Sequence, residues 1–227
     1  MGKESKILTA SSCRVIPAAH PAAPLIVVEG EEASPEELCS KLRLLTERPF
    51  HLVLHPVADW NDCLSPWPAD PIMKKAEPFG GNADRHLQEI TDQILPELLQ
   101  TYEMTPEWCG IAGYSLAGLF SIYSMYQTAC FERFVSASGS MWYPGFLNYC
   151  RMHAPKKPPQ AVYLSLGDAE AKTGHPILKT VQNCTEELAA YYQANEIPVQ
   201  YERNPGNHFR DAVRRLAKGI AWILDQN

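Results

Sequence analysis

The chain has 227 residues, of which 45% are apolar and 20% charged, the composition of an ordinary globular protein. Its length fits one compact domain, so we expect residues 1–227 to fold as a single unit. The net charge of −6 at pH 7 argues against nucleic acid or an anionic membrane surface as a partner.

The first half of the chain predicts two strands, two helices and one long loop. Residues 34–37 read Ser-Pro-Glu-Glu, a capping box with proline at the first helical position, and therefore predict a helix start. The loop from Ala58 to about Gly81 is far longer than most connections, which is typical of functional loops. In chain order we expect a strand at 25–28, the capped helix, a strand at 51–57, the long loop and a helix from Asn82 past Leu98, bent near Pro96.

The second half alternates strands with helices, and several of its strands are apolar without interruption. Such runs are typical of parallel strands whose two faces are both buried. The expected strands are 108–113, 133–137, 161–166 and 198–203, and the expected helices are 116–129, 176–195 and 209–224. This alternation predicts an α/β fold with a mostly parallel central sheet and helices on both faces.

One strand-to-helix turn carries a pattern used by serine hydrolases. Gly113-Tyr114-Ser115-Leu116-Ala117 follows an apolar strand and opens an apolar helix, which is the context of a nucleophile elbow. Ala117 stands where glycine is more usual. The amides that open the helix, beginning with Leu116, would stabilise a developing oxyanion. The alternative interpretation is an ordinary Gly-Ser turn between a strand and a helix.

A serine nucleophile needs a base, and in this fold the base follows both the serine and the acid in the chain. Three histidines follow Ser115. His208 lies in a Gly- and Asn-rich turn between the last strand and the last helix, where the fold places its base. His153 adjoins a proline-rich connector and His175 precedes a helix, so both fit this role less well.

The triad acid is expected after the next-to-last strand, at residues 161–166. Asp168 and Glu170 both follow that strand, and their spacing does not choose between them. The acid would hold the histidine tautomer and stabilise the imidazolium. Either carboxylate could instead cap its own turn.

Aromatic side chains gather in the segments expected around the elbow. Trp67 lies in the long loop, Trp142 follows the strand after the elbow, and Tyr114 precedes Ser115. We expect these three side chains to contact the substrate, although packing of the loops onto the core would explain them equally well. The backbone of the long loop should supply the second oxyanion donor.

With these residues in place, the chain resembles the putative-esterase family of α/β-hydrolases over about residues 50–225. That family includes esterase D-like enzymes, feruloyl esterases, enterobactin-type siderophore esterases and mycolyltransferases. The resemblance implies an α/β-hydrolase fold without a large cap domain and an ester substrate. It rests on Gly-Tyr-Ser115-Leu-Ala-Gly-Leu, Ser138-Gly-Ser-Met-Trp-Tyr143, Gly167-x-x-Glu170 and Gly206-Asn-His208-Phe209.

The resemblance also implies roles for individual residues. The family's acid often occupies the last position of a Gly-x-x-Asp/Glu turn, which selects Glu170 and leaves Asp168 as the fallback. Its oxyanion loop often holds His-Gly or Asp-Gly, whereas the strand here ends His55-Pro56 without glycine. The expected donors are therefore the amides of Leu116 and of Trp60 or a neighbour.

The expected function is hydrolysis of a carboxylic ester through an acyl-enzyme. Acyl transfer or thioester hydrolysis by the same residues stays open, as does a non-catalytic binding protein on a hydrolase scaffold. No cofactor is implied. No metal site is expected, because Asp62 and Asp70 in the long loop have no neighbouring histidine cluster.

The compartment is predicted from the termini and cysteines. The first ten residues carry no apolar run, and no segment approaches the roughly 18 apolar residues of a membrane span. The seven cysteines are odd in number and form no Cys-x-x-Cys motif. We therefore expect a cytoplasmic protein with free thiols, and the sequence leaves its oligomeric state open.

Overall fold

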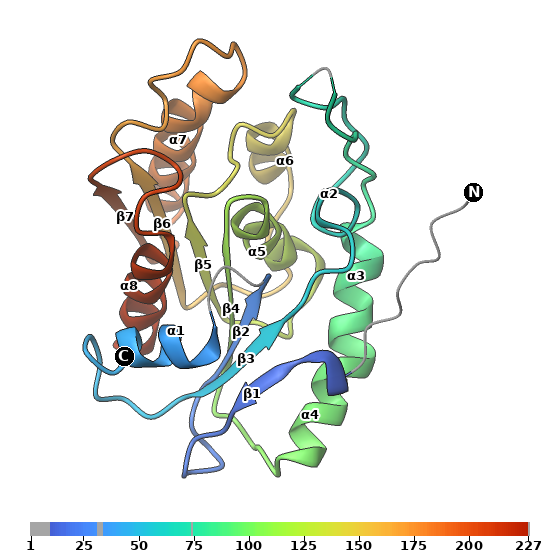
Figure 1. Ribbon diagram of the computed structural model, residues 1–227, viewed down its shortest axis with the longest axis vertical. Helices are drawn as coiled ribbons and strands as arrows, with labels where there is room; N and C mark the ends of the chain where they lie inside the picture. Colours follow the sequence, from blue (N-terminus) through green and yellow to red (C-terminus); the bar gives the residue numbers. More distant parts are fainter. Residues whose placement is uncertain (1–9, 31–33, 74, 227) are drawn as a thin grey trace.

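A seven-stranded sheet with the strand order β1-β3-β2-β4-β5-β6-β7 organises the fold (Figure 1). The computed structural model describes residues 10–30, 34–73 and 75–226. Every neighbouring pair is parallel except β1 with β3, which is antiparallel. The strands are β1 (Arg14–Ile16), β2 (Leu25–Glu29), β3 (His51–His55), β4 (Cys109–Tyr114), β5 (Arg133–Ala137), β6 (Ala161–Gly167) and β7 (Val199–Asn204).

Helices cover both faces of this sheet, as the strand–helix alternation predicted. The helices are α1 (Pro35–Leu42), α2 (Trp60–Cys63), α3 (Ala83–Glu89), α4 (Leu95–Thr101), α5 (Leu116–Gln127), α6 (Phe146–Met152), α7 (Val181–Ala194) and α8 (Ala212–Leu224). Three short elements complete the set: the 3-10 helices η1 (Ala10–Ser12) and η3 (Leu178–Thr180) and the π-helix η2 (Ile90–Ile94).

Two hydrophobic clusters lie on opposite faces of the sheet. Along β2, Leu25 and Val27 join the cluster under α3 to α7, while Ile26 and Val28 join the cluster under α1 and α8. In Figure 1, α1 and α8 lie on the same side of the sheet, in contact with each other. Because both faces are buried, the central strands need apolar residues at every position, which explains their unbroken apolar runs.

The helix predicted from Asn82 onward contains a π-helical turn. Residues 83–101 run as α3, η2 and α4 in succession, and Pro96 stands at the start of α4. Proline has no amide hydrogen, and its ring clashes with the carbonyl one turn earlier. The wider π-helical turn directly before Pro96 accommodates both effects, at the place where the sequence predicted a bend.

The sequence prediction lacked strand β1, helix α6, the 3-10 helix η1 and the four-residue helix α2, which lies inside the predicted long loop. Strand β1 has only three residues, which is too short for a recognisable alternation of apolar and polar side chains. Helix α6 buries only Phe146 and Cys150 and begins after Gly145 in the left-handed conformation, so its sequence carries little helical periodicity.

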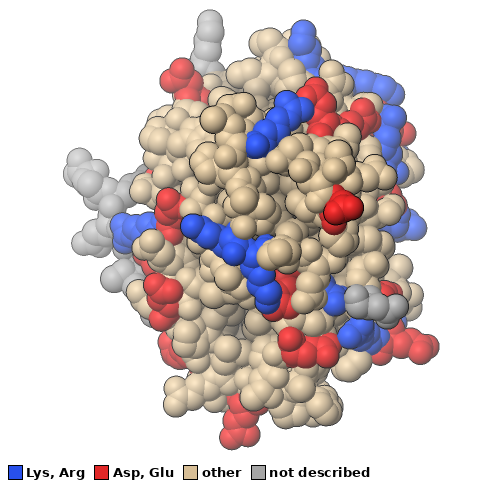
Figure 2. Space-filling view, turned by 180° about the vertical axis from the view of Figure 1, so that it is seen from behind, with Lys and Arg blue, Asp and Glu red and all other residues tan. Residues whose placement is uncertain are grey.

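The described surface carries mixed charge and no membrane-spanning helix. Lys and Arg are interspersed with Asp and Glu on the face shown in Figure 2. Among the described residues, no helix is long and apolar enough to cross a membrane. The expectation of no secretory signal rests on residues 1–10, of which the first nine lie outside the described part of the chain.

Candidate active site

Three loops that leave the same edge of the sheet form the site. Parallel strands end at a common edge, so the segments after β4, β6 and β7 come together there. Ser115 follows β4, Glu170 lies three residues beyond the end of β6, and His208 lies four residues beyond the end of β7. Their spacing along the chain is large, but the parallel topology makes them neighbours.

Ser115 has the backbone conformation of a sharp strand-to-helix turn. Its φ is 58° and its ψ is −120°, a strained combination for a residue that carries a side chain. Its amide donates to the carbonyl of Ala137, and its own carbonyl accepts from Leu119 and Ser140. These bonds hold the turn, and α5 begins directly after it with Leu116.

The glycine and the alanine of the elbow are explained by close packing. A Cβ added to Gly113 would lie 2.3 Å from the backbone carbonyl of Ala117 and 2.7 Å from its Cβ. Only glycine therefore fits at position 113, because any side chain there would clash with the backbone of Ala117. The tight approach needs glycine on one side of Ser115, and alanine is small enough for the other.

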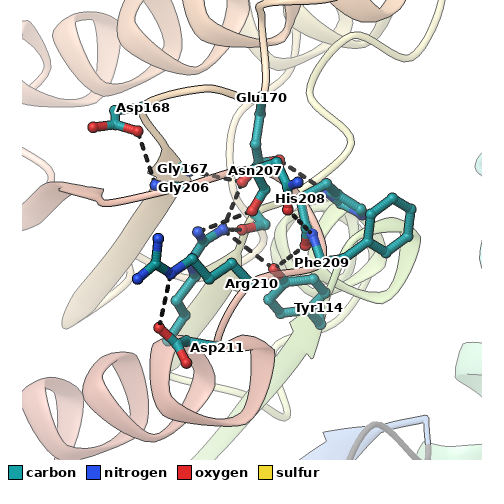
Figure 3. Close-up of polar contacts among 12 residues, drawn as sticks. Tyr114, Gly167, Asp168, Glu170, Gly206, Asn207, His208, Phe209, Arg210 and Asp211 are labelled. Atoms are coloured by element: carbon teal, nitrogen blue, oxygen red, sulfur yellow. Dashed lines mark hydrogen bonds and ion pairs between the residues drawn. The ribbon is translucent and has the colours of Figure 1, made fainter.

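The side chains of Ser115, His208 and Glu170 form a continuous hydrogen-bonded line. Nε2 of His208 lies 3.0 Å from Oγ of Ser115, and Nδ1 lies 2.7 Å from Oε2 of Glu170. Figure 3 shows Glu170 and His208 pointing toward one another from separate loops. The carboxylate is 3% exposed, whereas the imidazole is 33% exposed, so one end of the line is buried and the other reaches solvent.

Glu170 is held in its ionised form. Burial by itself raises the pKa of Glu170, but hydrogen bonds from His208 and from the amide of Gly167 lower it below the ordinary value. The Gly167 amide donates to Oε1 at 2.6 Å, which leaves Oε2 to face His208. A buried carboxylate ionised in this way can fix the tautomer of the imidazole.

Asp168, the alternative acid, has a different partner. Its Oδ1 accepts from the amide of Gly206 at 2.8 Å, and its own amide donates to the carbonyl of Asn204. Figure 3 shows Asp168 turned toward Gly206, at the start of the turn that carries His208. The structure therefore brings Glu170 to His208 and uses Asp168 to anchor the turn.

A cleft of about 390 Å³ opens beside Ser115 and His208. Its wall combines apolar and polar side chains, and one lysine, Lys172, is among them. The lining residues are Ile72, Ser115, Ser138, Ser140, Trp142, Ala169, Glu170, Lys172, Thr173, Leu178, Val181, Asn207, His208 and Phe209. Sequence reasoning did not single out Ile72, Lys172 or Phe209, because chain order alone does not show which loops face the serine.

Of the three aromatic residues expected to contact substrate, only Trp142 is among the described residues that line the cleft. The ring of Trp67 packs against Tyr143 and Tyr149, and its Nε1 donates to the carbonyl of Pro144. The hydroxyl of Tyr114 donates to the carbonyl of His208 at 2.6 Å. Trp67 thus packs the long loop onto the core, and Tyr114 holds the histidine turn.

The sheet order bears on the second oxyanion donor. Strand β4 lies between β5 and β2, which ends at Glu29, whereas β3, which leads into the Trp60 loop, lies one strand further away, beyond β2. The Trp60 ring packs over Gly30, because a Cβ at Gly30 would meet the ring at 2.8 Å. The segment after Gly30 passes through residues 31–33, which lie outside the described residues. Donation by Trp60 therefore stays a prediction.

A buried polar cluster lies at the ends of the neighbouring strands β2 and β3. Donor atoms of Glu29, His55 and His86 lie within 4.8 Å of one another, the one group among the described residues with the spacing of a metal site. In the structure, Glu29 bonds to Nδ1 of His55 at 3.1 Å and to Nε2 of His86 at 2.9 Å. These bonds tie β2, β3 and α3 together, while the buried Nε2 of His55 has no hydrogen-bond partner among the described residues.

Comparison with known proteins places this geometry in a family. The sequence profile of the family described as Putative esterase matches residues 42–220, a span that includes Ser115, Glu170 and His208. The chain belongs to this Putative esterase family. It is an ester-hydrolysing serine hydrolase, as the sequence analysis expected.

Relatives and similar structures of this esterase fit the assignment. The uncharacterized protein YbbA of Bacillus subtilis is 24% identical over 174 residues, which cover 73% of this chain and 70% of YbbA. The siderophore hydrolase EstA from Aspergillus nidulans has a TM-score of 0.74 at 15% identity, over 99% of this chain and 98% of EstA. The IroE-like serine hydrolase from Shewanella oneidensis has a TM-score of 0.79 at 14% identity, over 93% and 75% of the two chains. These likenesses confirm the α/β-hydrolase fold.

Proposed function

We propose that this esterase cleaves its substrate through an acyl-enzyme formed on Ser115. The observation that carries the proposal is the line of two hydrogen bonds from Ser115 through His208 to Glu170, at 3.0 and 2.7 Å. A serine hydroxyl is unreactive at neutral pH unless a base takes its proton. His208 is within hydrogen-bond reach of that proton, and Glu170 orients it from the other side.

The reaction then proceeds in two halves. Oγ of Ser115 attacks the ester carbon, its proton passes to Nε2 of His208, and the negative charge moves to the former carbonyl oxygen. We infer that the amide of Leu116, at the start of α5, stabilises that oxyanion. The bond to the leaving alcohol breaks as His208 returns the proton. Water repeats the sequence on the acyl-enzyme, releases the acid and restores Ser115.

Labelling of the serine tests this mechanism. A fluorophosphonate should modify wild-type protein at Ser115, located by mass spectrometry, and Ser115→Ala should remove both the label and roughly 10⁴–10⁶-fold of kcat. His208→Ala should slow labelling strongly, because the hydroxyl then lacks its base. A label on another serine, or unaltered activity in Ser115→Ala, would reject the assignment.

For the substrate, we infer a bulky ester with both apolar and polar parts. Trp142, Phe209 and Leu178 offer apolar surface beside Ser115, and Lys172 offers one positive charge. A siderophore ester suits this description and is suggested by the name of EstA, whose fold this chain shares. The assay is a comparison of kcat/KM between aryl-acyl and acetyl esters of one alcohol. Equal kcat/KM values would contradict binding of a bulky acyl group against Trp142, Phe209 and Leu178.

A further inference from the structure

Arg215 is a fully buried cation directly beneath the site. It lies in the first turn of α8 and is 1% exposed. A guanidinium stays protonated even in the interior, so its burial requires acceptors that offset the loss of water. Sequence reasoning missed this residue. Its burial could have been predicted from its place on the apolar face of α8, four residues before Gly219 and eight before Ile223.

One nitrogen of Arg215 contacts the buried end of the proposed triad. Nη1 donates to Oε1 of Glu170 at 2.8 Å, and also to Oγ of Ser138 at 2.9 Å and to the hydroxyl of Tyr114 at 3.3 Å. Oε1 of Glu170 is therefore fixed by the guanidinium and the Gly167 amide together. This arrangement leaves the other oxygen, Oε2, pointing at His208.

The second nitrogen holds the turn that carries the base. Nη2 donates to the carbonyls of Pro205 and Asn207, each at 3.0 Å, on the two sides of Gly206. The neighbouring backbone leaves room for this cation, since a Cβ at Gly167 would lie 2.8 Å from Nη2. One planar side chain thus links Glu170 to the His208 turn, and its two nitrogens make contacts that a single ammonium could not reproduce.

We propose that Arg215 is a positioning residue that aligns Glu170 with His208 and limits the negative charge that Glu170 presents to the imidazole. The inference rests on the proposed function, because it assigns Arg215 to the same triad. By bonding Oε1, the guanidinium withdraws part of the carboxylate charge that would otherwise stabilise the imidazolium.

Substitution of Arg215 leaves the other charged side chains around His208 chemically unaltered. Asp168 lies on the turn before it, Lys172 lines the same cleft, and Arg210 and Asp211 follow it in the chain. Loss of the Arg215 charge should therefore be the dominant electrostatic change at the imidazole. The acid limb of the kcat/KM profile should move to higher pH by roughly one unit, with kcat lowered about 10²-fold by misalignment.

The experiment compares Arg215→Met and Arg215→Lys with a matched control, Arg133→Met. Arg133 is also buried, at 4% exposure, and also donates to backbone carbonyls, those of Ile223 and Gln226, but at the opposite edge of the sheet. We expect Arg215→Met to show both the shifted acid limb and the reduced kcat. Arg215→Lys should show the wild-type acid limb but not the wild-type kcat. Lysine keeps the positive charge but lacks the planar guanidinium that contacts both Glu170 and the His208 turn. Arg133→Met should lose stability and keep the wild-type profile.

Each result has one interpretation. A folded Arg215→Met enzyme with the wild-type profile, or an equal shift in Arg133→Met, would overturn the proposal. If Arg215→Met fails to fold, Arg215→Lys decides: a lowered kcat supports the proposal, and unchanged kcat overturns it. Fluorophosphonate labelling of wild type separates the two levels of inference. A wild-type enzyme that is not labelled at Ser115 refutes the proposed function. If wild type is labelled and active, a failed prediction for the variants refutes only the role proposed for Arg215.

Discussion

Two neighbouring carboxylates illustrate how much a single residue's partner decides. Glu170 faces Nδ1 of His208, while Asp168 accepts from the amide of Gly206. Glu170→Gln should lower kcat by about 10⁴-fold, because an amide no longer holds the required imidazole tautomer. Asp168→Asn should be mild, because the asparagine oxygen still accepts from Gly206. Steady-state kinetics of the two variants, with melting curves to verify folding, makes the comparison. A larger loss in Asp168→Asn would reverse their roles.

At the scale of secondary-structure elements, the Glu29 cluster joins β2, β3 and α3. Burial raises the pKa of Glu29, but contacts with His55 and His86 lower it to about 2. Burial lowers the pKa of His86, but hydrogen bonds with Cys63 and Glu29 raise it to about 10. The lowered pKa of Glu29 stabilises the folded state at pH values above 4.5, its ordinary pKa. The raised pKa of His86 stabilises the folded state at pH values below 6.5, its ordinary pKa.

The network should therefore make stability depend on alkaline pH. We expect the free energy of unfolding to fall as pH rises from about 6.5 through 10, because over this range the unfolded state releases the His86 proton whereas the folded state retains it. Glu29→Gln should cost about 3–5 kcal/mol near pH 6 and flatten this dependence, since it leaves His86 without its anion. Urea unfolding at pH 6 and 9.5 measures both effects.

An exposed ion pair supplies the control for that measurement. Glu187 pairs with Arg151 at 3.0 Å, and its side chain is 54% exposed. Glu187→Gln should change the free energy of unfolding by less than about 1 kcal/mol at either pH, because water screens an exposed pair. A Glu29→Gln variant with the pH dependence of wild type would show that the buried network does not titrate as described.

For the whole molecule, the cysteines provide a test that needs no substrate. All seven are free in the structure, at positions 13, 39, 63, 109, 130, 150 and 184. Thiol titration in denaturant without reductant should return seven groups, and a lower count would reveal a disulfide. In native protein Cys130 should react first, since it is exposed, whereas burial raises the pKa of Cys150 to about 12 and slows its reaction.

By itself, the sequence determined most of the helices and strands and the sharp turn at Ser115. Apolar runs predicted the buried strands, the Ser34 capping box predicted α1, and Gly113 with Ser115 predicted the elbow, because each pattern acts within a few residues. The Gly167 turn likewise singled out Glu170 through a family resemblance. Local conformation is encoded locally, so a single chain is enough to recognise it.

Only the tertiary structure decided which distant residues meet. Sheet order put β2, rather than β3, beside β4, the strand that leads to Ser115. The long loop packs Trp67 against the core, while Phe209 and Lys172 line the cleft. The contacts of Arg215 with Glu170 and the His208 turn join segments up to 45 residues apart. Such contacts depend on how helices and strands pack, and no local pattern in the sequence carries that information.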